Sequence, residues 1–234
     1  MINYLNEIAV IGNDNRKAAI ERILKSIGVD YQIVGNYTKN IVVSFNPSSE
    51  RLVIGDHYDS YYNNGANDNA AACVILLNLI GDLKDTNKSI DFVFFDKEEQ
   101  GGIGSREYIE IVGKNNIKCM INLDMCGMGS NILLTYDKIG KFRFYFDCIE
   151  DIISDPNVTV LRELPFGDYN NFVRNRIQSI FIINSTDHDI AWFKGNMNIF
   201  PDFAKTMHRP TDTVDTFGDE GMNMIYEFLK DKLV

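Results

Sequence analysis

Two near-continuous runs of apolar residues constrain the fold of this chain more than any other feature of its sequence. They are residues 89–96 (SIDFVFFD) and residues 117–125 (IKCMINLDM). Such runs, without polar alternation, are typical of strands that are covered on both faces. Because segments with helical periodicity separate the apolar runs, we expect the α/β class: three α/β/α layers around a mixed, largely parallel central sheet.

Apolar residues with helical spacing predict where the helices lie. Residues 68–83 carry one apolar stripe, which is typical of a helix packed against a sheet. An earlier helix is expected to end at Gly28, a residue type that favours helix C-termini. A short helix is predicted after Ser105, and a last one begins near Asp219.

Shorter apolar segments predict the remaining strands. Residues 40–46 and 51–55 are interpreted as two strands joined by the turn-forming residues 47–49, an arrangement that resembles a β-hairpin. Further strands are expected at 131–136, 158–162 and 179–184. In residues 185–204 the polar and apolar residues are mixed without a clear period, so no element is predicted there.

The composition excludes some classes of protein and partner. The 234 residues contain no repeat or linker, so we expect a single domain over residues 1–234. A net charge of −10, without clustered Lys and Arg, argues against nucleic-acid binding. The sequence starts without a signal-peptide pattern, and no apolar run approaches the roughly 18 residues of a membrane span. We therefore expect a soluble, cytoplasmic protein with no membrane partner.

We expect the cysteines to be reduced, mostly buried thiols. The sequence shows no export signal, and none of the four cysteines forms a C-x-x-C pair. A bridge between Cys119 and Cys126 is the alternative. The other two cysteines are Cys73 and Cys148.

Acidic and imidazole residues gather where predicted strands end. Ligands of open α/β sheets bind beyond the carboxyl ends of the strands, so residues distant in sequence can converge there. Asp68 follows a loop rich in Asn and Gly and can reach the same crevice. The residues at the strand ends are His57 and Asp59, Glu98 and Glu99, and Asp124.

Several carboxylates in one crevice repel each other unless cations lie between them. Two divalent ions would balance the four carboxylates Asp68, Glu98, Glu99 and Asp124, with nitrogen ligands from two histidines, His57 and His208. One histidine, one terminal carboxylate and one shared carboxylate per ion leave a position for water, as in catalytic zinc sites. We expect two Zn²⁺ ions, with Co²⁺ or Mn²⁺ as substitutes.

Glu98 and Glu99 are adjacent, and adjacent side chains of a strand point to opposite faces. We therefore expect this pair in a loop, where one carboxylate binds metal and the other faces a metal-activated water as general base.

Six short motifs follow one another along roughly residues 50 to 216. They are His57-Tyr-Asp59-Ser60, residues 65–71 (GANDNAA), 95–101 (FDKEEQG), Gly104-Ser105, 122–125 (NLDM) and 208–213 (HRPTDT). This ordered series resembles that of the M28 zinc aminopeptidases, and its order makes it more specific than any single motif. The resemblance implies a zinc-exopeptidase fold and a minimal catalytic domain without the insertion of larger members.

The resemblance also implies a role for each site residue. It assigns His57 and Asp124 to one zinc, Glu99 and His208 to the other, Asp68 to both, and Glu98 to the general base. Asp59 would orient the ring of His57, and Asp212 would act similarly near His208. Tyr169, in the segment 167–172 (GDYNNF), would donate to a developing oxyanion.

These roles predict a di-zinc aminopeptidase that hydrolyses the N-terminal peptide bond of peptides. One alternative is a reaction like that of the glutaminyl cyclases, which look similar and commonly use a single zinc. Another is a protein that binds metal without catalysis.

Overall fold

The computed structural model describes residues 1–136, 150–161 and 166–233. Within them, one sheet has the strand order β1-β2-β4-β3-β5-β8-β6-β7. The neighbouring strands β4, β3, β5 and β8 are parallel, whereas β2 and β6 run antiparallel to them. The strands are β1 Gln32–Val34, β2 Asn40–Phe45, β3 Arg51–His57, β4 Ile90–Phe95, β5 Ile117–Leu123, β6 Asn131–Tyr136, β7 Val158–Val160 and β8 Gln178–Ser185.

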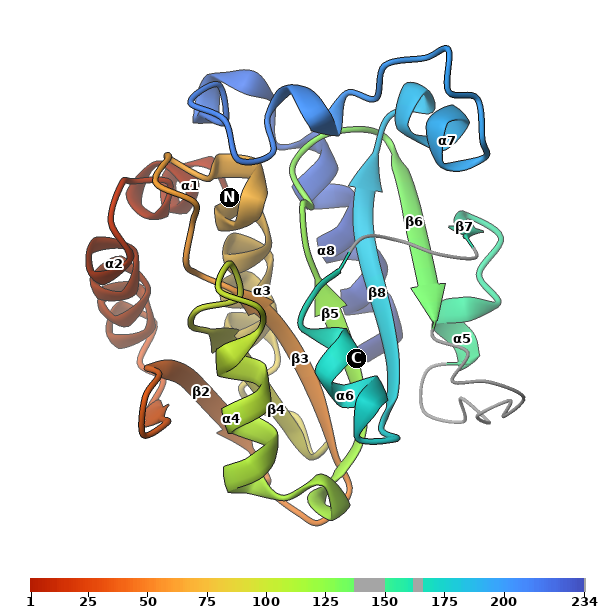
Figure 1. Cartoon of the computed structure of the whole chain (residues 1–234). Helices are drawn as coiled ribbons and strands as arrows, with labels where there is room; N and C mark the ends of the chain where they lie inside the picture. The colour runs from red at the N-terminus through yellow and green to blue at the C-terminus, as the bar shows by residue number, and fades with distance from the viewer. Residues whose placement is uncertain (137–149, 162–165, 234) are drawn as a thin grey trace.

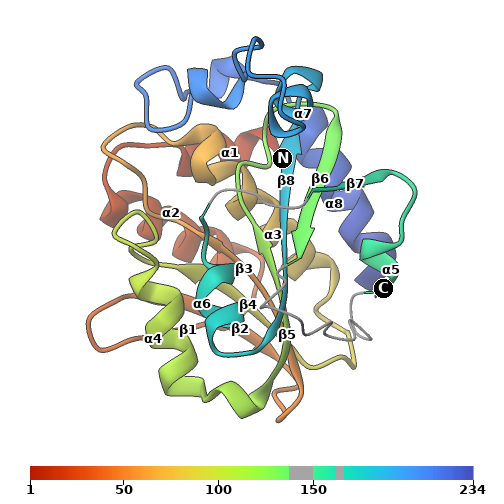
Figure 2. The same cartoon turned by 45° about the vertical axis from the view of Figure 1, so that its right-hand side comes forward.

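Helices cover both faces of the sheet (Figures 1 and 2). One face packs against α4 and α6, and the other packs against α3 and α8, with α1 and α2 beside α3. This arrangement confirms the three-layer α/β/α expectation. The helices are α1 Ile2–Ile8, α2 Asn13–Ser26, α3 Ala71–Asp82, α4 Ile103–Val112, α5 Glu150–Ile153, α6 Tyr169–Arg174, α7 Asp187–Phe193 and α8 Glu220–Leu233.

Strand β4 explains how one apolar run serves two cores. Its alternate residues Phe92 and Phe94 belong to the core under α3 and α8, whereas Val93 and Phe95 belong to the core under α4 and α6. Every residue of this strand is buried, so the run needs no polar face. The predicted strand at residues 89–96 is thereby confirmed. That the chain is one domain stays a prediction.

The predicted hairpin between residues 40–46 and 51–55 is wrong. Strand β4 lies between β2 and β3 and pairs with both. The connecting loop passes over the segment before β4, where Asn46 donates to the carbonyl of Thr86 at 2.6 Å and the amide of Ser48 donates to Ser89. Placing the fully buried β4 between two partners satisfies both of its edges, which a local hairpin would not do.

Several helix boundaries differ from the expectation. Helix α3 starts at Ala71, because Asp68 and Asn69 have non-helical backbone angles. Helix α4 starts at Ile103, before Ser105. The segment 185–204 contains the short helix α7, and the sequence predicted none of the helices α1, α5 and α6. The predicted strand 158–162 ends at Val160, and residue 162 lies outside the described residues.

The cysteine expectations are partly corrected. Cys73 and Cys126 are buried free thiols, so the alternative bridge from Cys119 to Cys126 does not form. Cys119 is disulfide-bonded, which contradicts the expected thiol at this position. Cys148 lies outside the described residues.

Among the described helices, none combines the length and the apolar character that crossing a bilayer requires.

Candidate metal centre

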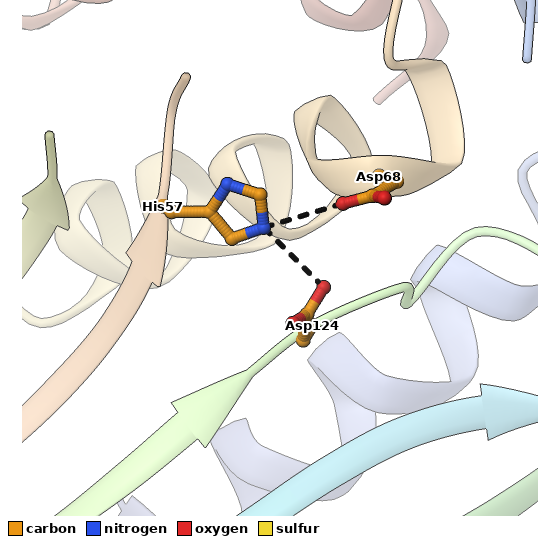
Figure 3. Close-up of side chains that lie close together, drawn as sticks. All are labelled: His57, Asp68 and Asp124. Carbon is orange, nitrogen blue, oxygen red and sulfur yellow. Dashed lines mark ion pairs between the residues drawn. The ribbon is translucent and has the colours of Figure 1, made fainter. Parts of the chain in front are cut away.

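The predicted site residues meet at the edge of the sheet where the parallel strands end. His57 is the last residue of β3, Asp124 follows β5, and Glu98 and Glu99 lie in the loop after β4. Figure 3 shows the ring of His57 directed between Asp68 and Asp124. The convergence at strand ends is the one that the parallel sheet requires.

His57, Asp68 and Asp124 form the first of two clusters that could hold a metal ion. The Nε2 atom of His57 lies 3.3 Å from Oδ1 of Asp68 and 3.5 Å from Oδ1 of Asp124. One candidate ligand atom from each residue lies within 4.8 Å of the others. All three residues are buried, so the carboxylates have little access to bulk water.

Asp68, Glu99 and His208 form the second cluster. The Nε2 atom of His208 lies 2.9 Å from Oε2 of Glu99 and 3.5 Å from Oδ2 of Asp68. Asp68 thus turns one oxygen to each cluster. The structure therefore brings together the five residues of the expected ligand set, with Asp68 between the two histidines.

Asp59 connects the ring of His57 to the loop of the two glutamates. Its Oδ1 lies 3.4 Å from Nδ1 of His57, and its carbonyl oxygen lies 3.1 Å from the same nitrogen. The two carboxylate oxygens accept the backbone N–H groups of Glu98 and Glu99 at 3.0 and 3.2 Å. Asp59 therefore fixes a candidate ligand and the neighbouring glutamate backbone at the same time.

Three residues with positive φ angles shape the loop of Glu98 and Glu99. Lys97, Gly101 and Gly102 have positive φ angles, and the amides of both glycines donate to the carbonyl of Glu98 at 2.8 Å. The loop placement explains how adjacent glutamates can both reach the site, as expected from their sequence.

Asp212 does not orient His208, contrary to the expectation. Its carboxylate accepts the backbone N–H groups of Asn67 and Asp68, at 2.7 and 3.0 Å. The role of Asp212 is therefore to hold the backbone of the shared residue Asp68. Sequence spacing placed Asp212 near the site but gave no sign of which group it would bind.

Burial disfavours the ionised form of three carboxyl groups at this site, those of Glu98, Glu99 and Asp124. Burial, with the neighbouring acids, raises the pKa of Glu98 to about 10 and that of Glu99 to about 8. Burial also raises the pKa of Asp124. Burial acts in the same sense on Asp68, but the hydrogen bond and charge of His57 outweigh it and lower the pKa of this carboxyl.

A cavity of about 310 Å³ opens beside the two clusters. Its lining includes Glu98 and all five candidate ligands, and elsewhere several apolar side chains that form an apolar wall. The apolar wall includes Phe193 and Phe203, whose rings stack at 5.5 Å, and Trp192 packs edge-on against both. Trp192 is not among the described lining residues, so it contacts the cavity wall only through these two rings.

Tyr169 is buried, and its ring stacks on that of Phe181 at 4.9 Å. Phe181 lines the cavity, whereas Tyr169 is absent from its described lining. The oxyanion role of Tyr169 stays a prediction.

Asp168 is a further candidate site residue, to which the sequence analysis assigned no role. It is fully buried, its carboxylate has no hydrogen-bond partner among the described residues, and burial raises its pKa to about 7. The signal was its position beside Tyr169, but no local pattern shows that this carboxylate is buried.

Comparisons with known proteins identify the family of this chain. The sequence model of peptidase family M28 matches residues 40–231. The chain is 33% identical over 116 residues to a glutaminyl-peptide cyclotransferase of Drosophila melanogaster, a match that covers 38% of this chain and 33% of that protein. It is 36% identical over 77 residues to the aminopeptidase YwaD of Bacillus subtilis, covering 30% of this chain and 17% of that protein.

A similar solved structure is that of a Zn-dependent exopeptidase from Parabacteroides distasonis. The TM-score is 0.69 at 17% identity, with 99% of this chain and 96% of that chain covered. At this identity the likeness concerns the fold. The chain spans a third or less of the length of the curated relatives it matches. Because the family match covers most of the sequence and includes every motif of the site, the chain belongs to peptidase family M28.

Proposed function

We propose that this protein is a zinc-dependent aminopeptidase that hydrolyses the N-terminal peptide bond of peptides. The observation that carries the proposal is the pair of clusters sharing Asp68 beside a cavity that Glu98 also lines. Membership of a peptidase family favours a peptide substrate, and the aminopeptidase among the relatives favours exopeptidase action.

The donor set fits two zinc ions. Each cluster offers one imidazole nitrogen and two carboxylates, which is typical of zinc sites that keep an open position. Oδ1 of Asp124 and Oε1 of Glu99 are buried and lack a hydrogen-bond partner among the described residues. Bound cations would satisfy such oxygens. In this proposal His57 and Asp124 hold one ion, Glu99 and His208 hold the other, and Asp68 contacts both.

Zinc ions, when bound, polarise a carbonyl group and lower the pKa of water. Glu98 is the proposed general base, whose carboxylate takes a proton from the attacking water and passes it to the departing amine nitrogen. Nearby cations favour the ionised carboxylate, so they oppose the effect of burial on the pKa of Glu98. Co²⁺ and Mn²⁺ are the expected substitutes for zinc.

Two further residues have proposed supporting roles. Asp59 holds the ring of His57 and the backbone of Glu98 in a fixed relative position, because its carboxylate lies near both. Tyr169 is the proposed donor to the developing oxyanion, on the ground that its ring packs on the cavity residue Phe181.

The test is an activity assay with a panel of aminoacyl chromogenic substrates. The purified protein is loaded with zinc, its zinc content is measured, and turnover is followed before and after treatment with a chelator. We expect turnover that the chelator abolishes and that added zinc restores. Zinc-replete protein without turnover on any member of the panel would contradict the proposal.

A second candidate is aminoacyl cyclisation, as in glutaminyl cyclases. It is favoured by the 33% identity to a glutaminyl-peptide cyclotransferase. The two reactions differ in product, since cyclisation of a peptide with N-terminal Gln releases ammonia and leaves the peptide bond intact. Ammonia release without peptide cleavage, from protein with a single zinc ion, would establish this second candidate instead.

A further inference from the structure

The two histidines of the metal centre are held in different ways. The side chain of His57 is 1% exposed, and its Nδ1 faces Asp59. The side chain of His208 is 43% exposed, and its backbone has a positive φ of 57°. No described residue forms a hydrogen bond or an ion pair with Nδ1 of His208. A metal-bound imidazole is usually oriented by an acceptor that faces its second ring nitrogen. Among the described residues, such an acceptor faces His57 but not His208.

At His208, an aromatic ring takes the place of this acceptor. The ring of Tyr61 stacks on the imidazole of His208, with 4.8 Å between the ring centroids and 23° between the ring planes. Stacking of this kind restricts rotation of the imidazole about its side-chain bonds, because tilting the ring would separate the two faces. Tyr61 itself is 52% exposed, so its ring contributes little to the core.

The loop that carries Tyr61 is tied down on both sides. Nδ2 of Asn63 donates to the carbonyl of Arg209 at 2.9 Å, next to His208 in the chain. On the other side, the guanidinium of Arg16 donates to the carbonyl of Asn64 at 2.9 Å. The ring of Tyr61 is thus held in place by the backbone around it rather than by its own burial.

We propose that Tyr61 is a positioning residue for the second metal site, where it holds the imidazole of His208 in the plane that directs Nε2 toward Glu99 and Asp68. This inference rests on the proposed function, because it takes His208 as a zinc ligand. Tyr61 contacts a candidate ligand and not the reacting atoms, so its removal changes metal affinity first and turnover only as a consequence.

The test compares the affinities of both ions in the wild-type protein and in Tyr61→Ala. Metal-free protein is titrated with Co²⁺ and followed by visible absorption, and zinc affinities are measured by competition with a chromogenic chelator. We expect Tyr61→Ala to lower the affinity for one of the two ions about tenfold. An effect of this size is typical for groups that orient a metal-bound histidine. The other ion keeps its affinity, and Tyr61→Phe, which retains the ring, binds both ions as the wild type does.

Two further variants separate positioning from general effects on the protein. Asn63→Ala releases the loop from Arg209 and is expected to lower the affinity for the same ion. Tyr37→Ala removes a tyrosine that is 83% exposed and is expected to leave both affinities unchanged. The thermal denaturation midpoint of the metal-free protein should be the same in Tyr61→Ala and Tyr37→Ala, since neither ring is buried.

Two results would overturn the inference, and they are distinguishable. If the wild-type protein binds fewer than two ions, the second site does not exist, and the two-zinc proposal is also contradicted. Wild-type protein that binds two ions, with both affinities unchanged in Tyr61→Ala, leaves the proposed function intact and shows that Tyr61 does not position His208.

Discussion

The carboxylate of Asp212 accepts the backbone N–H of Asp68 at 3.0 Å, although the two residues are 144 positions apart in the chain. Asp212 belongs to the segment that also supplies His208. The hydrogen bond therefore joins two segments that each contribute a candidate ligand, and it fixes the residue that the two clusters share. A change at Asp212 should for this reason affect both metal sites together.

We predict that Asp212→Asn weakens the binding of both zinc ions about tenfold. The amide keeps the size of the carboxylate but turns one donor toward a backbone N–H, so one of the two hydrogen bonds to residues 67 and 68 is lost. Competition with a chromogenic chelator measures the affinities. Asp215→Asn, at an exposed position of the same segment, is the matched control. Loss of only one ion would show that the hydrogen bond from Asp68 to Asp212 does not support both sites.

A second prediction concerns Asp59, which accepts the backbone N–H groups of Glu98 and Glu99. In Asp59→Asn, one of these N–H groups faces an amide donor, so the glutamate loop shifts relative to His57. We expect turnover of aminoacyl substrates to fall by roughly 10- to 100-fold. Steady-state kinetics on zinc-loaded protein measures the change, with the exposed Asp30→Asn as control. Wild-type turnover in Asp59→Asn would refute the positioning role.

A third prediction separates the proposed base from the ligands. Glu98→Gln removes the group that moves the proton but none of the five candidate ligands. We expect kcat to fall by about 10² to 10⁴ while two zinc ions remain bound. Zinc analysis and kinetics on the same preparation provide both measurements. The exposed Glu50→Gln serves as control. Loss of zinc in Glu98→Gln would instead make this residue a ligand.

The sequence was sufficient to predict the edge of the sheet where the site lies. His57, Glu98 and Asp124 each follow an apolar run, and the carboxyl ends of parallel strands meet at one edge. Both pieces of information are local, because an apolar run and the polar residue after it can be read from a few adjacent letters. The convergence of distant residues then follows from the topology of α/β sheets.

The sequence was not sufficient where a long-range contact decides the structure. The position of β4 between β2 and β3 depends on the burial of both edges of β4, whereas the short link between the flanking strands favours a local hairpin. The contacts of Asp212 with residue 68 and of Tyr61 with His208 have no periodicity or spacing that predicts them. Such contacts arise from loops, whose paths depend on the whole fold.

A fourth prediction concerns Arg16, which is fully buried in α2. Its guanidinium donates to the carbonyls of Tyr58, Asn64 and Gly65, which lie on either side of Tyr61. Arg16→Met leaves these carbonyls without their donor, and we expect the free energy of unfolding to fall by about 3 kcal/mol. Urea denaturation of the metal-free protein measures the change.

The control for Arg16 is Arg22→Met in the same helix. Arg22 forms an exposed ion pair with Glu7, and such pairs contribute between about 0 and 1 kcal/mol. If the two variants lose the same stability, the buried hydrogen bonds of Arg16 do not anchor the loop.

A fifth prediction concerns the pH dependence of stability, at a carboxylate remote from the metal centre. Glu107 of α4 accepts the backbone N–H groups of Asn36, Tyr37 and Thr38, at 2.6, 3.0 and 3.0 Å. Burial acts to raise the pKa of Glu107, but these hydrogen bonds and that of the Thr38 hydroxyl outweigh it and lower the pKa below 4.5. The ionised carboxylate is therefore favoured in the folded state over the unfolded state.

A lowered pKa in the folded state gives a stabilisation that is present above the pKa of the unfolded state, near 4.5, and is lost as the pH falls through the lower folded value. Glu107→Gln has no such charge at any pH, so we expect it to be less stable than the wild type by about 2 kcal/mol at pH 7. This difference should shrink progressively below about pH 4.5, because the wild type then protonates the same oxygen atoms. Urea denaturation between pH 3 and 7 measures it, with the exposed Glu110→Gln of the same helix as control. A difference that stays constant over this range would mean that the charge of Glu107 does not stabilise the turn at residues 36–38.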